Sequence, residues 1–186
     1  MMESKHSPIT KTCAYDTERL HVLPWKEYAD SAEKVLAFAE LVTEILSPEV
    51  TKDLPAGWQQ IITSADAKQW VQERDEESSL LLIQDQSSQS IIGLMFLHES
   101  ESDDSSIEVR LGYLISQEHW GMGYATELIK GLVHWCKGIE KIKSISGGVE
   151  SANIGSIKVL EKNSFKCESE PNASTLFFEY HFQRGH

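Results

Sequence analysis

The sequence feature that most constrains the fold is a strand-like segment that turns through two closely spaced glycines directly into a helical segment. Residues 107–116 alternate and are rich in β-branched and aromatic side chains, which predicts a strand. After Gly121 and Gly123, apolar residues recur at helical spacing as far as residue 136. The chain from 107 to 165 is therefore predicted to be organised around a strand–turn–helix junction.

This junction is predicted to bind an anion. The first amides of a helix have no partner within the helix, and the positive end of the helix dipole lies at the same point. Gly121 and Gly123 remove the side chains that would keep a phosphate from the backbone. The spacing is not that of a nucleoside-triphosphate P-loop, and Thr126 stands where a dinucleotide-binding fold has its third glycine. The sequence therefore indicates a phosphate cradle of another kind.

Length and composition predict one domain over residues 1–186, with 1–16 as a flexible N-terminal arm. A chain of 186 residues with 40% hydrophobic and 25% charged residues suits a single globular core. No apolar run approaches bilayer length, and residues 1–12 are polar, without the core of a signal peptide. We therefore expect a soluble, cytoplasmic protein.

The charge and the cysteines narrow the class of partner. A net charge of −12 argues against nucleic acid or an anionic membrane, and it is compatible with a cationic substrate such as an amine or a basic peptide. Cys13, Cys136 and Cys167 show no Cys-x-x-Cys spacing, so neither a disulfide framework nor a zinc site is predicted. No metal is expected.

The remaining patterns predict an α+β fold with a mixed sheet. Asp30 or Ser31 is expected to cap a helix that ends near Leu46, and Ser64 is expected to cap a second helix that ends near residue 76. Asn153 caps a third helix over 154–163, besides the helix that follows the glycines. Strands are expected at 17–25, 80–83, 90–97, 107–116, 141–150, 165–168 and 175–182.

Three spaced motifs resemble the GNAT superfamily of acetyl-CoA-dependent N-acetyltransferases. They are Leu-Gly-Tyr-Leu-Ile-Ser at 111–116, Glu-His-Trp-Gly-Met-Gly-Tyr-Ala-Thr-Glu at 118–127, and Asn153-x-x-Ser156-x-x-x-Leu160-Glu-Lys-x-x-Phe165. Together with Thr-Glu-Arg-Leu at 17–20, they are similar to the branch that acetylates ribosomal-protein N-termini at alanine or serine.

Two departures accompany the resemblance. Asn163 and Ser164 replace the usual Leu-Gly, and Arg110 takes a strand position often held by glutamate. The fold that the resemblance implies is a three-layer α/β arrangement, with a mostly antiparallel sheet, a splayed central strand pair and about four flanking helices.

The resemblance implies a binding site for acetyl-CoA as co-substrate. Main-chain amides of the cradle would hold the diphosphate, and unpaired backbone groups at the end of the central strand would hold the pantetheine arm like an added strand. Asn153 would contact the same arm, and Ser156 would lie near the thioester sulfur. The implied cofactor-binding residues are Leu114, Ile115, Ser116, Trp120, Gly121, Met122, Gly123, Tyr124, Ala125, Asn153 and Ser156.

The resemblance also implies direct acetyl transfer to a primary amine. Because alkyl amines are mostly protonated at pH 7, a base must remove a proton, and the leaving thiolate needs a hydrogen bond. We assign the second role to Ser156, and the amide of Leu114 is expected to stabilise the developing oxyanion. Glu108, on the same strand face as Arg110, is the first candidate for the base, and Glu179 is the second.

Several assignments stay open at this stage. The acceptor is a protein N-terminus or a small amine, and the oligomeric state is monomer or homodimer. A non-catalytic module that senses acyl-CoA is the main alternative, and a nucleotide-binding protein is disfavoured by the loop spacing. Asn153 and Ser156 also fit a plain helix cap. The other side chains weighed for the site are Trp25, Trp58, Trp70, His119, Lys158 and Lys162.

Overall fold

The computed structural model describes residues 7–184, which form one sheet of eight strands in the order β1-β2-β3-β4-β5-β6-β8-β7. Neighbouring strands are antiparallel except for β5 and β6, which are parallel. The strands are β1 (Tyr15–Asp16), β2 (Leu20–Pro24), β3 (Ser79–Asp85), β4 (Ile91–Glu101), β5 (Ile107–Ile115), β6 (Ile142–Glu150), β7 (Lys166–Cys167) and β8 (Thr175–His181).

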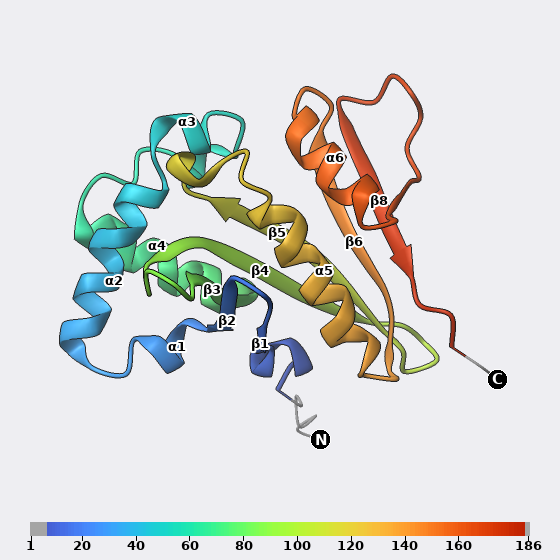
Figure 1. The fold of residues 1–186 in the computed structure, drawn as a ribbon, viewed down its shortest axis with the longest axis horizontal. Helices are drawn as coiled ribbons and strands as arrows, with labels where there is room; N and C mark the ends of the chain where they lie inside the picture. Colours follow the sequence, from blue (N-terminus) through green and yellow to red (C-terminus); the bar gives the residue numbers. More distant parts are fainter. Residues whose placement is uncertain (1–6, 185–186) are drawn as a thin grey trace.

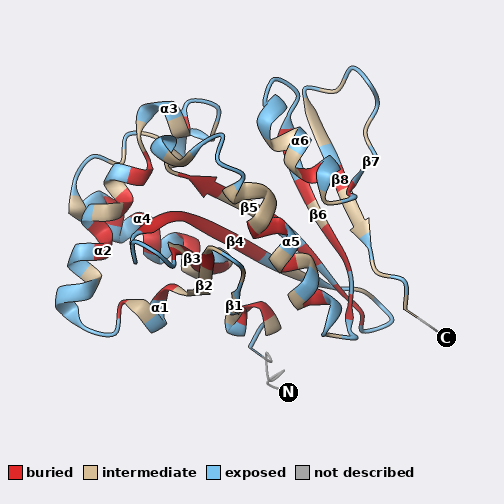
Figure 2. Ribbon diagram, viewed as in Figure 1, coloured by how far each residue is buried: buried red, intermediate tan, exposed pale blue. Residues whose placement is uncertain are grey.

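Helices cover both faces of this sheet (Figures 1 and 2). The longer ones are α2 (Ala32–Ile45), α4 (Ser64–Glu77), α5 (Tyr124–Lys137) and α6 (Ile154–Lys162). Among the described residues there are also two four-residue helices, α1 (Trp25–Tyr28) and α3 (Pro48–Thr51), and three 3₁₀ turns, η1 (Ile9–Thr12), η2 (Ala56–Trp58) and η3 (Gln117–His119). No helix within residues 7–184 is both long and apolar enough to cross a membrane.

The core consists of two apolar clusters separated by the sheet. Leu81 of β3 packs in the cluster that contains Leu128 of α5, whereas the next residue, Leu82, packs in the cluster that contains Phe38 of α2. Successive side chains of a strand point to opposite faces, so β3 and β4 supply both clusters and are apolar over residues 80–83 and 91–97. This arrangement confirms the predicted three-layer α+β fold.

The central strands β5 and β6 diverge along their length. They pair in parallel only from Ile107 to Arg110 of β5, opposite Ile142 to Ser146 of β6. Beyond that point β5 continues beside β4 alone, and β6 continues beside β8 alone. Figure 1 shows the two halves of the sheet separating toward α3 and α6. The splayed central pair, here called the fork, is therefore confirmed.

The chain before β2 packs against the molecule, which corrects the expectation of a flexible arm for residues 9–16. Thr10 and Cys13 are fully buried, and β1 pairs with β2. Tyr15 lies over Gly131 of α5, where a Cβ atom would stand 2.4 Å from the tyrosine ring. The close approach of β1 to α5 therefore requires glycine there. Residues 1–6 of the expected arm lie outside the described residues.

The helix starts agree with the predicted signals, with one shift. The Ser31 hydroxyl accepts the amide hydrogen of Lys34 at the start of α2, so Ser31 and not Asp30 is the cap. Thr63, not Ser64, caps α4 through a reciprocal pair of hydrogen bonds with Asp66. The Asn153 side chain accepts from the Ser156 amide and caps α6, as predicted.

Candidate active site

The two glycines between β5 and α5 adopt left-handed conformations. Gly121 has a φ of +73° and Gly123 a φ of +82°, which L-residues with side chains rarely adopt. A Cβ on Gly121 would meet no atom within 4 Å, so this side of the loop is open. The amides of residues 121–126 have no hydrogen-bond acceptor among the described residues. These six free donors at a helix start form the predicted cradle, and they fit an anionic group.

The amide of Trp120 is not part of this cradle. It donates to the carbonyl of Gln117 at 3.1 Å and closes the turn η3. The expectation that Trp120 contributes its main-chain N–H is therefore wrong. Its side chain is placed at the fork instead, because the indole Nε1 donates to the Ile115 carbonyl at 2.8 Å. His119 lies beside it and bonds the Ser116 hydroxyl through Nδ1 at 2.6 Å.

The backbone of β5 corrects a second assignment. The Ser116 amide donates to the Ile92 carbonyl of β4 at 2.8 Å, so it is not unpaired. Hydrogen-bonded pairs recur at every second residue of an antiparallel ladder, and Leu114 lies opposite Leu94 in the same register. The Leu114 amide therefore also faces β4, and the oxyanion role expected for it is wrong. The backbone groups that face the fork belong to Tyr113 and Ile115.

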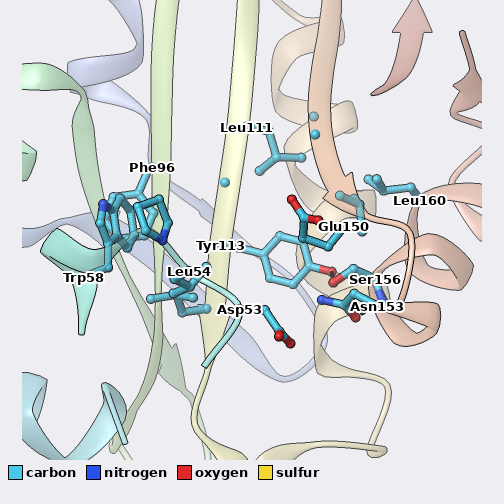
Figure 3. A pocket seen from close by; sticks show the side chains of 16 residues that line it. Asp53, Leu54, Trp58, Phe96, Leu111, Tyr113, Glu150, Asn153, Ser156 and Leu160 are labelled. Atoms are coloured by element: carbon cyan, nitrogen blue, oxygen red, sulfur yellow. Dashed lines mark hydrogen bonds between the residues drawn. The ribbon is translucent and has the colours of Figure 1, made fainter. Parts of the chain in front are cut away.

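A cavity of about 300 Å³ opens where the fork widens (Figure 3). Residues 111–114 of β5 form one wall, and residues 147–150 of β6 form another. Asn153, Ser156 and Leu160 of α6 close one end, while the loop from Asp53 to Trp58 closes the other. The cavity thus joins the two diverging strands, α6 and the segment between α3 and η2.

Tyr113 and Ser156 meet inside this cavity. Figure 3 shows the tyrosine side chain reaching from β5 toward α6, where its hydroxyl donates to Ser156 Oγ at 3.2 Å. Burial raises the pKa of Tyr113, and the hydrogen bond with Ser156 opposes this only in part. The phenol is therefore neutral at pH 7 and stays a donor. The motifs did not single out Tyr113, although it lies within the strand motif itself.

The structure does not bring Glu108 to the cavity. Glu108 lies in the paired part of β5, opposite Ser144, and five residues before Tyr113. At about 3.4 Å per residue, this separation is about 17 Å along the strand. Glu179 pairs with Ser146 below the fork and forms an ion pair with His181 at 3.3 Å. Neither glutamate lines the cavity, so the structure does not support either of them as the base.

Two other carboxylates line the cavity, and sequence patterns did not mark either. Glu150 ends β6, where its Oε1 accepts a hydrogen bond from the Thr175 hydroxyl at 2.9 Å. Asp53 comes from the loop after α3 and is exposed. No lysine, arginine or histidine of the described residues lines the cavity. Its charged groups are therefore all acidic.

An aromatic wall faces these acids. The Trp58 ring packs edge-on against Phe96 at 4.9 Å and against Trp70 at 5.3 Å between centroids. The guanidinium carbon of Arg74, a buried residue, lies 5.1 Å from the centroid of the Trp58 ring. Trp58 and Phe96 line the cavity, as was considered for Trp58, whereas Trp25 and Trp70 belong to the core. Lys158 and Lys162 are exposed on α6.

A cradle, a fork and a cavity at one junction define an acetyltransferase fold, and the comparisons assign its family. The family model described as an acetyltransferase (GNAT) domain matches residues 19–166. The chain therefore belongs to the GNAT acetyltransferase family, as its motifs predicted.

Individual relatives match at lower similarity. An uncharacterized N-acetyltransferase, p20, from Bacillus licheniformis is 32% identical over 66 residues, which are 36% of this chain and 37% of that relative. The chain thus matches little more than a third of the relative's length.

Solved structures match nearly the whole chain. A GNAT-family acetyltransferase from Bacillus anthracis superposes with a TM-score of 0.72 at 16% identity, over 91% of this chain and 98% of that one. The ribosomal L7/L12 α-N-protein acetyltransferase RimL, in complex with coenzyme A, gives 0.67 at 14% identity, over 89% and 95%. At such identities the likeness establishes the fold.

Proposed function

We propose that this protein transfers the acetyl group of acetyl-CoA to a cationic primary amine that carries apolar groups. The observation that carries the proposal is the cavity in the widening fork, lined by β5, the strand whose continuation leads into the cradle. Acetyl-CoA supplies the activated thioester. The free amides of residues 121–126 suit its diphosphate, and the fork-facing backbone of Tyr113 together with the amide of Ile115 suits its amide-bearing arm.

Ser156 and Tyr113 suit the leaving sulfur. In the transfer the amine nitrogen bonds to the acetyl carbon, the carbon–sulfur bond breaks, and the thiolate leaves. The Ser156 hydroxyl donates a hydrogen bond to that sulfur while its oxygen accepts from Tyr113. A donor that is itself hydrogen-bonded is polarised and therefore stabilises the developing negative charge more strongly.

Glu150 suits the removal of the amine proton. It stands at the end of β6, and the hydrogen bond from Thr175 limits its motion. An ammonium ion must lose a proton before it attacks, and a carboxylate accepts that proton directly or through one water molecule. Asp53, on the opposite loop, suits the positive charge of the incoming acceptor.

The cavity lining supports the acceptor class. Two acids and no base favour a cation, and Leu54, Trp58 and Phe96 favour carbon next to the amino group. Both a peptide N-terminus and a small arylalkyl or alkyl amine meet these conditions. Of these two acceptors, the peptide N-terminus is the one favoured by the motifs, which resemble the branch of the family that acetylates ribosomal-protein N-termini.

An acceptor screen tests the proposal. The protein is incubated with acetyl-CoA and a panel of N-terminal peptides, arylalkyl amines, alkyl diamines and neutral alcohols. Thiol release and the mass of each product are then followed. We expect acetylated amines and no acetylated alcohol. Binding of coenzyme A by calorimetry without any acetylated product would contradict catalysis and favour an acyl-CoA-sensing module.

A further inference from the structure

Arg19, which precedes β2, lies against the glycine cradle although it is 103 residues away from Met122 in the chain. Its Nη1 donates to the Met122 carbonyl at 2.9 Å, between the two left-handed glycines. Its Nε donates to the Glu127 carboxylate on the first turn of α5 at 2.7 Å. One guanidinium thus holds both the loop and the helix that follows it.

The orientation of Arg19 is fixed from several directions. Glu127 also accepts the Thr17 hydroxyl hydrogen at 2.6 Å and the Arg19 amide hydrogen at 2.7 Å. The guanidinium carbon lies 4.2 Å from the centroid of the Tyr124 ring, whose hydroxyl donates to Asp85 at 3.2 Å. A stacked and doubly hydrogen-bonded guanidinium keeps one orientation.

One nitrogen of Arg19 is left over. Nη2 has no hydrogen-bond partner among residues 7–184. It lies 3.5 Å from the position that a Cβ on Gly123 would occupy, so it stands beside the free amides of the cradle. Guanidinium N–H groups next to unpaired amides form a strong site for phosphate oxygens.

We propose that Arg19 binds the diphosphate of acetyl-CoA through Nη2, while its Nε and Nη1 hold the cradle open for the same group. The proposal rests on the proposed function. It assigns a cofactor-binding residue outside the strand, loop and helix motifs, contributed by the beginning of the chain.

Calorimetry with coenzyme A and with 3′-dephospho-coenzyme A tests this assignment without an acceptor. A charge-assisted hydrogen bond is lost in Arg19→Ala, so we expect affinity for both ligands to fall by the same factor, about tenfold to 100-fold. Arg19→Lys retains the charge but not the fork of donors, and we expect it to recover only part of the affinity. Arg110→Ala, on the exposed face of β5, removes the same charge and serves as the matched control.

The outcomes separate the alternatives. Affinity of Arg19→Ala within about twofold of the unmodified protein would overturn the assignment, as would a loss seen with coenzyme A but not with the dephospho form. The latter result would place Arg19 at the 3′-phosphate. Thermal melting checks the fold of each variant. If Arg19→Ala is unfolded, the affinities of Arg19→Lys for coenzyme A and for the dephospho form are compared instead. No binding of either ligand by the unmodified protein would overturn the proposed function as well.

Discussion

The hydroxyl groups of Tyr113 and Ser156 lie 3.2 Å apart in the open part of the fork, one on the central strand β5 and one on the helix α6. The distance depends on the divergence of β5 and β6, because only an unpaired strand end leaves room for a side chain between them. Each hydroxyl is therefore positioned by a different half of the sheet.

This pair predicts a non-additive effect on turnover. We expect Ser156→Ala to lower kcat by about 100-fold, because it removes the hydrogen bond to the leaving sulfur. Tyr113→Phe is expected to lower kcat by about tenfold, and the double variant should be no slower than Ser156→Ala, because Tyr113 acts through Ser156. Steady-state thiol release measures all three. Independent, multiplying losses would show that the two hydroxyls act separately.

The position of the two acids in the cavity predicts which carboxylate accepts the proton of the amine. Glu150→Gln is expected to lower kcat by about 100-fold, because the proton acceptor is lost while the shape is kept. Glu108→Gln is the matched control, since Glu108 lies far down β5, and its kcat should not change. Asp53→Asn should raise KM for the acceptor more than it lowers kcat. A lowered kcat in Glu108→Gln together with an unchanged kcat in Glu150→Gln would contradict the site as described.

The cradle predicts a specific sensitivity at two glycines. Gly121→Ala and Gly123→Ala would force a side chain into left-handed backbone, at about 1–2 kcal/mol each, and would crowd the free amides. We expect both to weaken the binding of coenzyme A in calorimetric titrations. Gly57→Ala is the control, because a Cβ there meets no atom within 4 Å and φ is not left-handed. An equal effect at Gly57 would refute a role for the loop geometry.

The carboxylate of Glu127 predicts a dependence of stability on pH. Partial burial disfavours its charge, but hydrogen bonds from Thr17 and Arg19 outweigh this and set its pKa below the ordinary 4.5. A carboxylate whose pKa is lowered in the folded state stabilises the fold at pH values above its ordinary pKa. This stabilisation is lost as the pH falls through the lowered pKa.

Urea unfolding at several pH values checks this expectation. The difference in unfolding free energy between the unmodified protein and Glu127→Gln should be largest near neutral pH and should shrink as the pH falls through the ordinary pKa of a glutamate and then through the lowered one. A difference that grows toward acid would reverse the sign and show that the folded protein prefers protonated Glu127. The exposed Glu108→Gln gives the baseline.

Local sequence signals predicted the features that depend on neighbours in the chain. Ser31, Asn153 and the two glycines act within a few residues of their position, so their roles as caps and turns were readable. Local geometry also explains how the chain tolerates Asn163 and Ser164 in place of the Leu-Gly that is usual in the family. Ser164 adopts a left-handed φ of +67° where the family has glycine, and the Asn163 side chain donates to the carbonyls of Val159 and Thr126.

The site residues that escaped prediction depend on the register between distant segments. Whether the amide of Leu114 or that of Ile115 faces the fork is decided by the pairing with β4, and a single-strand pattern does not contain that pairing. Glu150 and Asp53 likewise line one cavity only because the tertiary fold brings the end of β6 and the loop after α3 to it. Glu108 satisfied the alternation of its strand but lies at its far end.

The helix that follows the cradle is braced by both ends of the chain. Tyr15 donates its hydroxyl hydrogen to the Leu128 carbonyl at 2.8 Å, and Arg184 donates to four carbonyls between Cys136 and Ile142. All of these donors fall outside the 19–166 segment that the family model matches. A fragment trimmed to that segment would retain every residue that lines the cavity, but it would lose these contacts and also β8, the strand that pairs with the outer part of β6. Boundaries for shortened versions of this protein are therefore better drawn from the contacts of α5 than from the extent of family similarity.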